Sequence, residues 1–111
     1  MASSDILKEM IGQFSENEAV RKEIAGFNKT FQFSTTEGKD YYVSVTNGEV
    51  IFSEGKAATA TVTISGKDEI LSDLYQGKAD PVMSYMSGKI KVSGDIMSAT
   101  KIMGLLKKLK K

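Results

Sequence analysis

The apolar residues of this chain change their spacing along the sequence, and this change constrains the fold more than any other feature. Near the N-terminus they recur at helical intervals, and from Phe31 they alternate with polar residues as on a half-buried strand. From Ile70 the helical interval returns, interrupted by one more alternating stretch at 89–93. The sequence therefore predicts an α+β protein rather than a repeated strand–helix–strand unit.

Four alternating runs in the middle of the chain predict an antiparallel meander with one apolar face. Asn47-Gly48 separates two of the runs, and this pair favours a tight hairpin. The opposite face, which carries Gln32 and Thr63, is expected to be solvated. With the strand at 89–93, the prediction is a five-stranded, mostly antiparallel sheet with about five helices on one of its faces.

Composition excludes several classes of function. The chain has no Cys and no His, so it lacks a thiol nucleophile, a thiolate metal site, an imidazole base and the commonest transition-metal ligand. The carboxylate groupings, Asp68-Glu69 with Asp73 and Asp80 near Asp95, are the remaining candidates for acid–base chemistry. Asp68, Asp80 and Asp95 each stand where a helix N-cap is expected, which accounts for them without catalysis. We expect no catalytic residue, no metal and no cofactor.

Length predicts one domain over residues 1–111, and the lack of signal and membrane-span patterns predicts a cytoplasmic protein. The formal net charge of +1 provides no global field for nucleic acid. The N-terminus has no basic and apolar signal pattern, and charges interrupt each apolar run before it reaches the length of a membrane span.

Gly-Lys occurs five times, at residues 38, 55, 66, 77 and 88. The last four are eleven residues apart, but their flanks differ in type, so a repeat is not supported. A phosphate-binding loop is not supported either, because no Ser or Thr follows any of these lysines. We interpret these pairs as turns.

Two further features have competing interpretations. The methionines of the predicted helices either fill the core or line an adaptable apolar cavity; they are Met10, Met83, Met86, Met97 and Met103. Residues 101–111 hold five lysines and no acid. Such a basic amphipathic helix either docks on an anionic membrane or only compensates its own dipole. The lysines predicted to contact membrane are Lys101, Lys107, Lys108, Lys110 and Lys111.

The stretch from Met86 to Met97, Met-Ser-Gly-Lys-Ile-Lys-Val-Ser-Gly-Asp-Ile-Met, resembles the signature of the sterol carrier protein 2 lipid-transfer family. In that family Gly-Lys, an alternating apolar–Lys–apolar run and Ser-Gly-Asp precede the C-terminal helix. Ala60-Thr61-Val62-Thr63-Ile64 resembles an upstream strand of the family, and Gly77-Lys78 and Asp80-Pro81 resemble the segment between. The resemblance covers roughly residues 5–109.

This resemblance implies that the sheet and helices enclose an apolar tunnel for fatty acid, fatty acyl-CoA, phospholipid or sterol. The helix at 96–111 would cover the tunnel as a lid, loosened by Gly104. The ligand-binding positions that it implies are Phe14, Phe33, Leu71, Leu74, Tyr75, Met83, Met86, Val92, Ile96, Met97, Ile102, Met103 and Leu106.

We therefore expect a non-enzymatic intracellular lipid carrier that exchanges its ligand with membranes or with lipid-metabolising enzymes. Two alternatives remain open. In one, the chain is an interaction module with a fully packed core that binds a partner enzyme or a second copy. In the other, weaker alternative, carboxylates act on an apolar substrate. The sequence specifies neither the lipid nor the oligomeric state.

Overall fold

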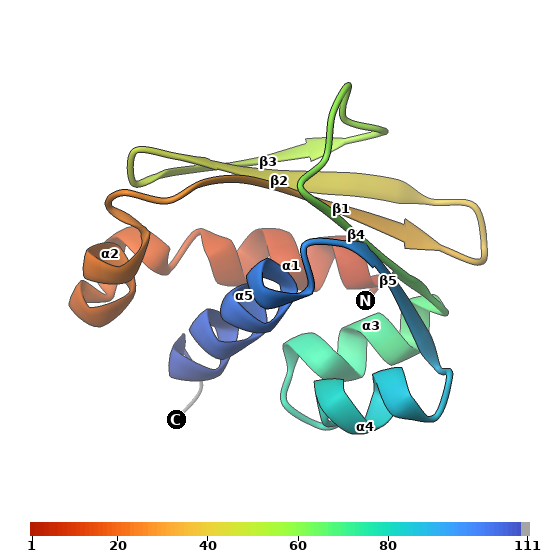
Figure 1. Cartoon of the computed structure of the whole chain (residues 1–111). Helices are drawn as coiled ribbons and strands as arrows, with labels where there is room; N and C mark the ends of the chain where they lie inside the picture. Colours follow the sequence, from red (N-terminus) through yellow and green to blue (C-terminus); the bar gives the residue numbers. More distant parts are fainter. Residues whose placement is uncertain (110–111) are drawn as a thin grey trace.

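Five strands form one mixed sheet in the order β3-β2-β1-β4-β5, in a computed structural model that describes residues 1–109 (Figure 1). The strands are β1 (Asn28–Thr35), β2 (Asp40–Thr46), β3 (Glu49–Glu54), β4 (Val62–Gly66) and β5 (Ile90–Gly94). Every neighbouring pair is antiparallel except β1 and β4, which run parallel. The predicted α+β class and mostly antiparallel five-stranded sheet are confirmed.

The helices lie together on one side of this sheet (Figure 1). They are α1 (Ser3–Ile11), a short 3-10 turn η1 (Phe14–Glu16), α2 (Glu18–Ile24), α3 (Asp68–Tyr75), α4 (Pro81–Met86) and α5 (Ile96–Leu109). The predicted stripe of α1 is buried at Ile6, Leu7 and Ile11. Phe14, one of the implied ligand-binding residues, belongs to η1 and is also buried.

The predicted meander is wrong at its fourth strand. β4 does not follow β3 in the sheet but crosses to the free side of β1, where Phe33 is in register with Ile64. Alternation specifies which face of a strand is buried but not which strand it pairs with. The meander therefore extends over β1, β2 and β3 only.

The loop from β3 to β4 passes over the outer face of the sheet, above β1 (Figure 1). Ala57 N–H donates to Gln32 Oε1 at 2.8 Å, and Gln32 Nε2 donates to the carbonyls of Tyr41 and Gly55, each at 3.1 Å. Gln32 is thus only 6% exposed. The prediction that Gln32 is solvated is wrong, because this loop covers it.

The predicted hairpin between β2 and β3 is confirmed. Asn47 and Gly48 have φ values of 51° and 85°. Positive φ at both central residues is the geometry of a type I′ turn, whose twist matches that of the flanking strands.

The helix α5 belongs to the core rather than forming a detachable lid. Its buried apolar side chains pack in the same cluster as those of the sheet and of α1 and α3. They are Ala99, Ile102, Met103, Leu105 and Leu106. Deleting residues 96–111 would therefore remove part of the core, and loss of binding in that deletion could not be ascribed to an opened lid.

Candidate functional site

An apolar groove lies where α4, β5 and α5 meet, and it has a volume of about 370 Å³. Its floor is formed by inward-facing residues of two strands, Ile64, Ile90 and Val92. Val82 and Tyr85 of α4 form one wall, and both are substantially exposed, so the groove is open to solvent. Pockets that bind small ligands have volumes of about 300–1,000 Å³, so this groove is large enough for one.

The helix α4 leaves this side of the sheet open because it is short. Asp80 starts it, with its Oδ2 accepting from Met83 N–H at 2.8 Å, and Pro81 occupies the first helical position. Gly88, with a φ of 81°, follows its end and turns the chain into β5. The helix has six residues and buries only Ser84. It therefore covers little of the sheet.

A tight connection from β5 leads into α5, which forms the other wall. Gly94 has a φ of 102°, and a Cβ atom there would lie 2.5 Å from the carbonyl oxygen of Thr61. Only glycine fits this close approach. Asp95 then accepts hydrogen bonds from Ser98 N–H and Ser98 Oγ, at 3.2 and 2.9 Å. These bonds, together with the nearby Lys29 ammonium, lower the pKa of Asp95 below its usual value.

One stripe of α5 faces the groove, and two of its members, Ala99 and Met103, also belong to the buried core. The groove stripe consists of Ile96, Ala99, Thr100, Met103, Gly104 and Lys107. Gly104 has no heavy atom within 4 Å of the position a Cβ would take. The groove thus has open space beside the middle of this helix.

The charged residues of the groove lining are Asp80 and Lys107. The Asp80 carboxylate caps α4, whereas Lys107 belongs to the last turns of α5. An amphipathic ligand would thus place its apolar part in this groove and pair its anionic head group with the Lys107 ammonium.

The structure divides the thirteen predicted ligand-binding residues into three sets. One set lies in the packed core, at 5% exposure or less: Phe14, Phe33, Leu71, Leu74, Tyr75, Ile102 and Leu106. A second set lines the groove: Val92, Ile96 and Met103. The third set points to solvent outside the groove lining: Met83, Met86 and Met97. An enclosed tunnel lined by all three sets is not seen within residues 1–109.

The exposed methionines match neither interpretation of their role. Met83, Met86 and Met97 are 66%, 76% and 81% exposed, so they neither fill the core nor line the groove. The helical interval would allow either Met83 with Met86 or Val82 with Tyr85 to face inward. The contacts of α4 place Val82 and Tyr85 at the groove.

Other groove residues were not predicted, although a signal existed for some of them. Ile64 and Ile90 alternate with polar residues in the sequence, but nothing in the sequence showed that the helices leave this part of the sheet open. Thr100 and Gly104 follow Ile96 at helical spacing. A search for the stripe rather than for large apolar residues would have found them.

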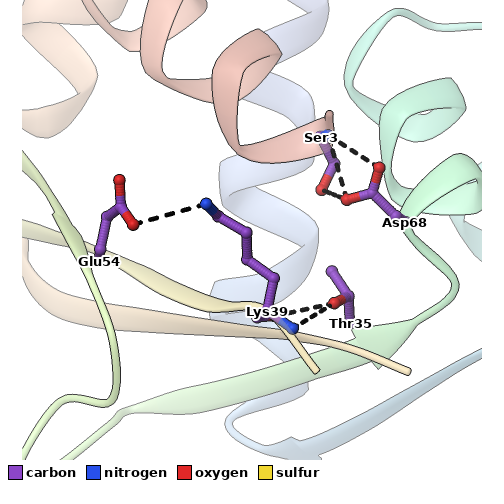
Figure 2. A network of polar contacts seen from close by, with 5 residues as sticks. All are labelled: Ser3, Thr35, Lys39, Glu54 and Asp68. Atoms are coloured by element: carbon purple, nitrogen blue, oxygen red, sulfur yellow. Dashed lines mark hydrogen bonds and ion pairs between the residues drawn. The ribbon is translucent and has the colours of Figure 1, made fainter. Parts of the chain in front are cut away.

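The three aspartates predicted as N-caps all accept backbone hydrogens at helix starts, but Asp68 caps a different helix from the one expected. Its carboxylate accepts from Ser3 N–H, at 3.1 and 3.2 Å, and from Ser3 Oγ at 2.7 Å (Figure 2). Asp68 therefore caps α1, while Glu37 accepts from the N–H of Asp68 itself. The carboxylates of Asp80 and Asp95 cap α4 and α5 as predicted.

A buried chain of hydroxyls continues from Asp68 into the core. Ser3 Oγ lies 2.7 Å from the Tyr41 hydroxyl, which lies 2.8 Å from that of Tyr75. Burial raises the pKa of Tyr41 to about 12 and that of Tyr75 well above its usual value. Because Ser3, Tyr41 and Tyr75 are at most 1% exposed, this chain links elements rather than meeting a substrate.

The lysines of the basic C-terminal segment differ in their contacts. Lys101 pairs with Glu23 at 3.4 Å and lies over the ring of Phe27, and Lys108 also pairs with Glu23. Lys107 lies in the groove lining. Lys110 and Lys111, also predicted to contact membrane, lie outside the described residues.

The described residues form neither a cluster able to hold a metal ion nor a helix able to span a membrane. Residues 1–109 contain no group of three or more acidic, His or Cys side chains placed to hold a metal ion. Over the same residues, no helix has the length and apolarity required to cross a membrane.

Comparison with known proteins gives a family. A profile described as the SCP-2 sterol transfer family matches residues 7–107. The chain is 32% identical over 91 residues to hydroxysteroid dehydrogenase-like protein 2 of Xenopus tropicalis, a match covering 81% of this chain and 22% of that protein. The chain thus spans about a fifth of the length of this relative.

Two further proteins are similar over most of their length. A fatty acid-binding protein of Yarrowia lipolytica is 26% identical over 109 residues, covering 93% of this chain and 84% of that protein. The solution structure of palmitated SCP2L2 from Aedes aegypti has a TM-score of 0.73 and 18% identity, covering 96% of this chain and 95% of that one. This second likeness shows a shared fold.

Proposed function

Because the chain belongs to the SCP-2 sterol transfer family, we propose that it is a non-enzymatic carrier of fatty acid, fatty acyl-CoA or a related lipid. Membership in this family and similarity to a fatty acid-binding protein support a lipid-binding or transfer role. The acyl chain lies in the groove between α4, β5 and α5, and the carrier exchanges it with membranes or enzymes. The observation that carries this proposal is the apolar groove of about 370 Å³ with Lys107 in its lining.

The physical basis is burial of the acyl chain against apolar side chains. Each buried methylene contributes roughly 0.8 kcal/mol, and much of this gain is offset by ordering the ligand and by its own micelle or membrane alternative. With Lys107 as the cation in the lining, selectivity would rest on an anionic head group and on chain length. The fatty acid-binding relative and the palmitated structure support an acyl ligand.

The interaction-module alternative is less well supported. It requires that the gap between helices and sheet be fully packed, whereas the groove leaves space beside α5. Of the carboxylates considered for catalysis, Asp68, Asp80 and Asp95 cap helices, which supports the non-enzymatic role.

A substitution at Gly104 tests the site directly, because Gly104 lines the groove and a Cβ atom there would meet no neighbouring side chain within 4 Å. We expect Gly104→Phe to weaken binding of a fluorescent fatty acid by at least about tenfold, since the ring displaces buried methylenes. Gly104→Ala is the matched control: it adds one methyl group, favours the helix by about 1 kcal/mol and should retain binding.

Thermal unfolding of both variants establishes that they fold. Native mass spectrometry of the unmodified protein, followed by lipid extraction, should show a bound lipid at near one per chain. If Gly104→Phe binds the fatty acid as tightly as the unmodified protein, the acyl chain does not lie in this groove. If the unmodified protein binds no lipid, the carrier function is wrong and the interaction module becomes the better hypothesis.

A further inference from the structure

A second groove, with three lysines in its lining, adjoins β5. It has a volume of about 460 Å³, and its lining includes Thr36, Ser65, Lys67, Lys89 and Lys91, with no acidic residue. Within residues 1–109, no carboxylate forms an ion pair with these lysines. Their three positive charges are therefore available to an anionic partner.

Two of the Gly-Lys pairs in the sequence converge at this groove. A Cβ atom on Gly66 would lie 3.0 Å from the carbonyl oxygen of Lys89, so the backbones of the two segments approach closely. Gly66 is in register with Ile90 at the start of β5. The absence of a side chain at Gly66 thus brings Lys67 and Lys89 to one place, although 22 positions separate them in the sequence.

The apolar residues next to this basic groove belong to α4. Met86 stands three positions before Lys89. Val82, Met83 and Met86 are 59%, 66% and 76% exposed, and Tyr85 is 45% exposed. An exposed apolar helix face beside lysines is typical of segments that lie in a membrane interface, where apolar side chains enter the acyl region and lysines meet anionic head groups.

We propose that these residues form a docking face for an anionic lipid bilayer. The α4–β5 face consists of Val82, Met83, Tyr85, Met86, Lys67, Lys89 and Lys91. The proposal rests on the proposed carrier function, and the anionic bilayer is then the partner with which the acyl groove exchanges its ligand. Val82 and Tyr85 belong both to this face and to the wall of the acyl groove, so docking places the mouth of that groove against the bilayer.

Charge favours this face over Lys101 and Lys108, two of the C-terminal lysines that the sequence indicated. Lys101 and Lys108 share Glu23 as an ion-pair partner, which compensates part of their charge. Lys67, Lys89 and Lys91, in contrast, line the groove that follows the end of α4 and are free of ion pairs within the described residues.

The test is co-sedimentation with vesicles of phosphatidylcholine alone and of equimolar phosphatidylcholine and phosphatidylglycerol. The unmodified protein should bind the anionic vesicles more tightly, and added salt should weaken this binding. The triple variant Lys67→Ala/Lys89→Ala/Lys91→Ala should lose about 100-fold in affinity for anionic vesicles. The variant Met83→Gln/Met86→Gln should lose affinity while keeping the charge.

The matched control is Arg21→Ala/Lys22→Ala/Lys56→Ala, which removes the same charge from exposed positions on α2 and on the loop after β3. Figure 1 shows α2 at the opposite side of the molecule from β5. The control should retain nearly all vesicle binding. Equal loss in the control and the face variant would overturn the proposal, because binding would then follow net charge alone.

Binding of a fluorescent fatty acid without vesicles separates the two proposals. The face variants should bind it as the unmodified protein does. If the fatty acid binds but the vesicles do not, the docking face is wrong and the carrier function stands; if the unmodified protein binds no fatty acid, the carrier function falls. Dimerisation in sedimentation velocity that Met83→Gln/Met86→Gln abolishes, without vesicle binding, would assign the face to a second copy instead.

Discussion

The helices of this protein pack fully against one part of the sheet, here called the sealed region, and leave another part accessible, here called the open region. Beneath β1 and β2, α1 and α3 pack together, with Leu7 and Leu71 both fully buried. Beneath β4 and β5, the six-residue α4 buries one side chain and leaves a groove. The same kind of sheet surface is thus either packed or available, depending on the length and anchoring of the helix that covers it.

Anchoring differs as much as length. The sealed region has a hydrogen-bonded chain from Asp68 through Ser3 and Tyr41 to Tyr75, which joins two helices and a strand. Aromatic contacts add to it, since the ring of Phe33 stacks on Tyr41 at 5.4 Å and meets Tyr75 edge-on at 5.6 Å. At the open region, α4 has a local cap at Asp80 but no comparable link across the core within residues 1–109.

The largest expected contrast comes from truncating one apolar side chain in each region. Phe33→Ala should lower the free energy of unfolding by about 3–5 kcal/mol, because it leaves a cavity in a fully packed core. Met83→Ala should change it by less than about 0.5 kcal/mol, because the side chain is mostly exposed. Urea unfolding measures both. Similar losses in the two variants would contradict the division into a sealed and an open region.

A smaller contrast is expected between two capping aspartates. Asp68→Ala removes an acceptor that joins α1 to α3, and we expect it to cost about 1–3 kcal/mol because Ser3 N–H and Oγ lose their partner in a partly buried site. Asp80→Ala removes only a local cap and should cost about 0.5–1 kcal/mol.

Thermal and urea unfolding of the two aspartate variants give these values. Asp68→Asn keeps an acceptor oxygen of the same size and serves as the control, which should be less destabilised than Asp68→Ala. Equal effects of Asp68→Ala and Asp80→Ala would mean that the link between α1 and α3 adds nothing beyond capping.

A further effect, absent at neutral pH, is an alkaline loss of stability from the sealed region. Tyrosine in the unfolded chain loses its proton near its ordinary pKa of 10.0, whereas folded Tyr41 keeps its proton to about 12. The unfolded state therefore binds fewer protons between these values, and stability falls as pH rises through this window. Urea unfolding at a series of pH values measures how steeply the free energy of unfolding falls with pH.

In the variant Tyr41→Phe, the free energy of unfolding should fall less steeply with pH across that window. The variant also loses the hydroxyl hydrogen bonds at every pH. An unchanged slope would mean that burial of this phenol does not contribute to the alkaline limb. Variants at exposed positions of α4, such as Met86→Gln, should leave the slope as it is.

Much of the fold could be predicted because local chemistry decides it. The type I′ turn at Asn47-Gly48 needs residues that tolerate positive φ, and Asp80-Pro81 specifies a helix start through a cap acceptor and a fixed φ. Alternation at Phe31, Phe33 and Tyr41 identified an inner face that the structure buries completely. These features depend on residues adjacent in sequence, so a pattern reveals them.

The candidate site was predicted less well, because it depends on where elements meet. The helical interval could not decide between the Met83–Met86 and Val82–Tyr85 sides of α4, since both pairs have the same spacing. Large apolar residues were assigned to ligand binding, but Phe14 and Leu71 fill the core, while Gly104, which has no side chain, borders the open groove.

The sequence by itself determined the order and type of the elements, the inner face of the strands and the likeness to a lipid-transfer family, because periodicity, turn residues and motifs are local properties. Only the tertiary structure decided that β4 pairs with β1, that Asp68 caps α1, and that a groove opens beside α5. Those outcomes depend on contacts between distant residues and on which surfaces remain uncovered once all helices have packed.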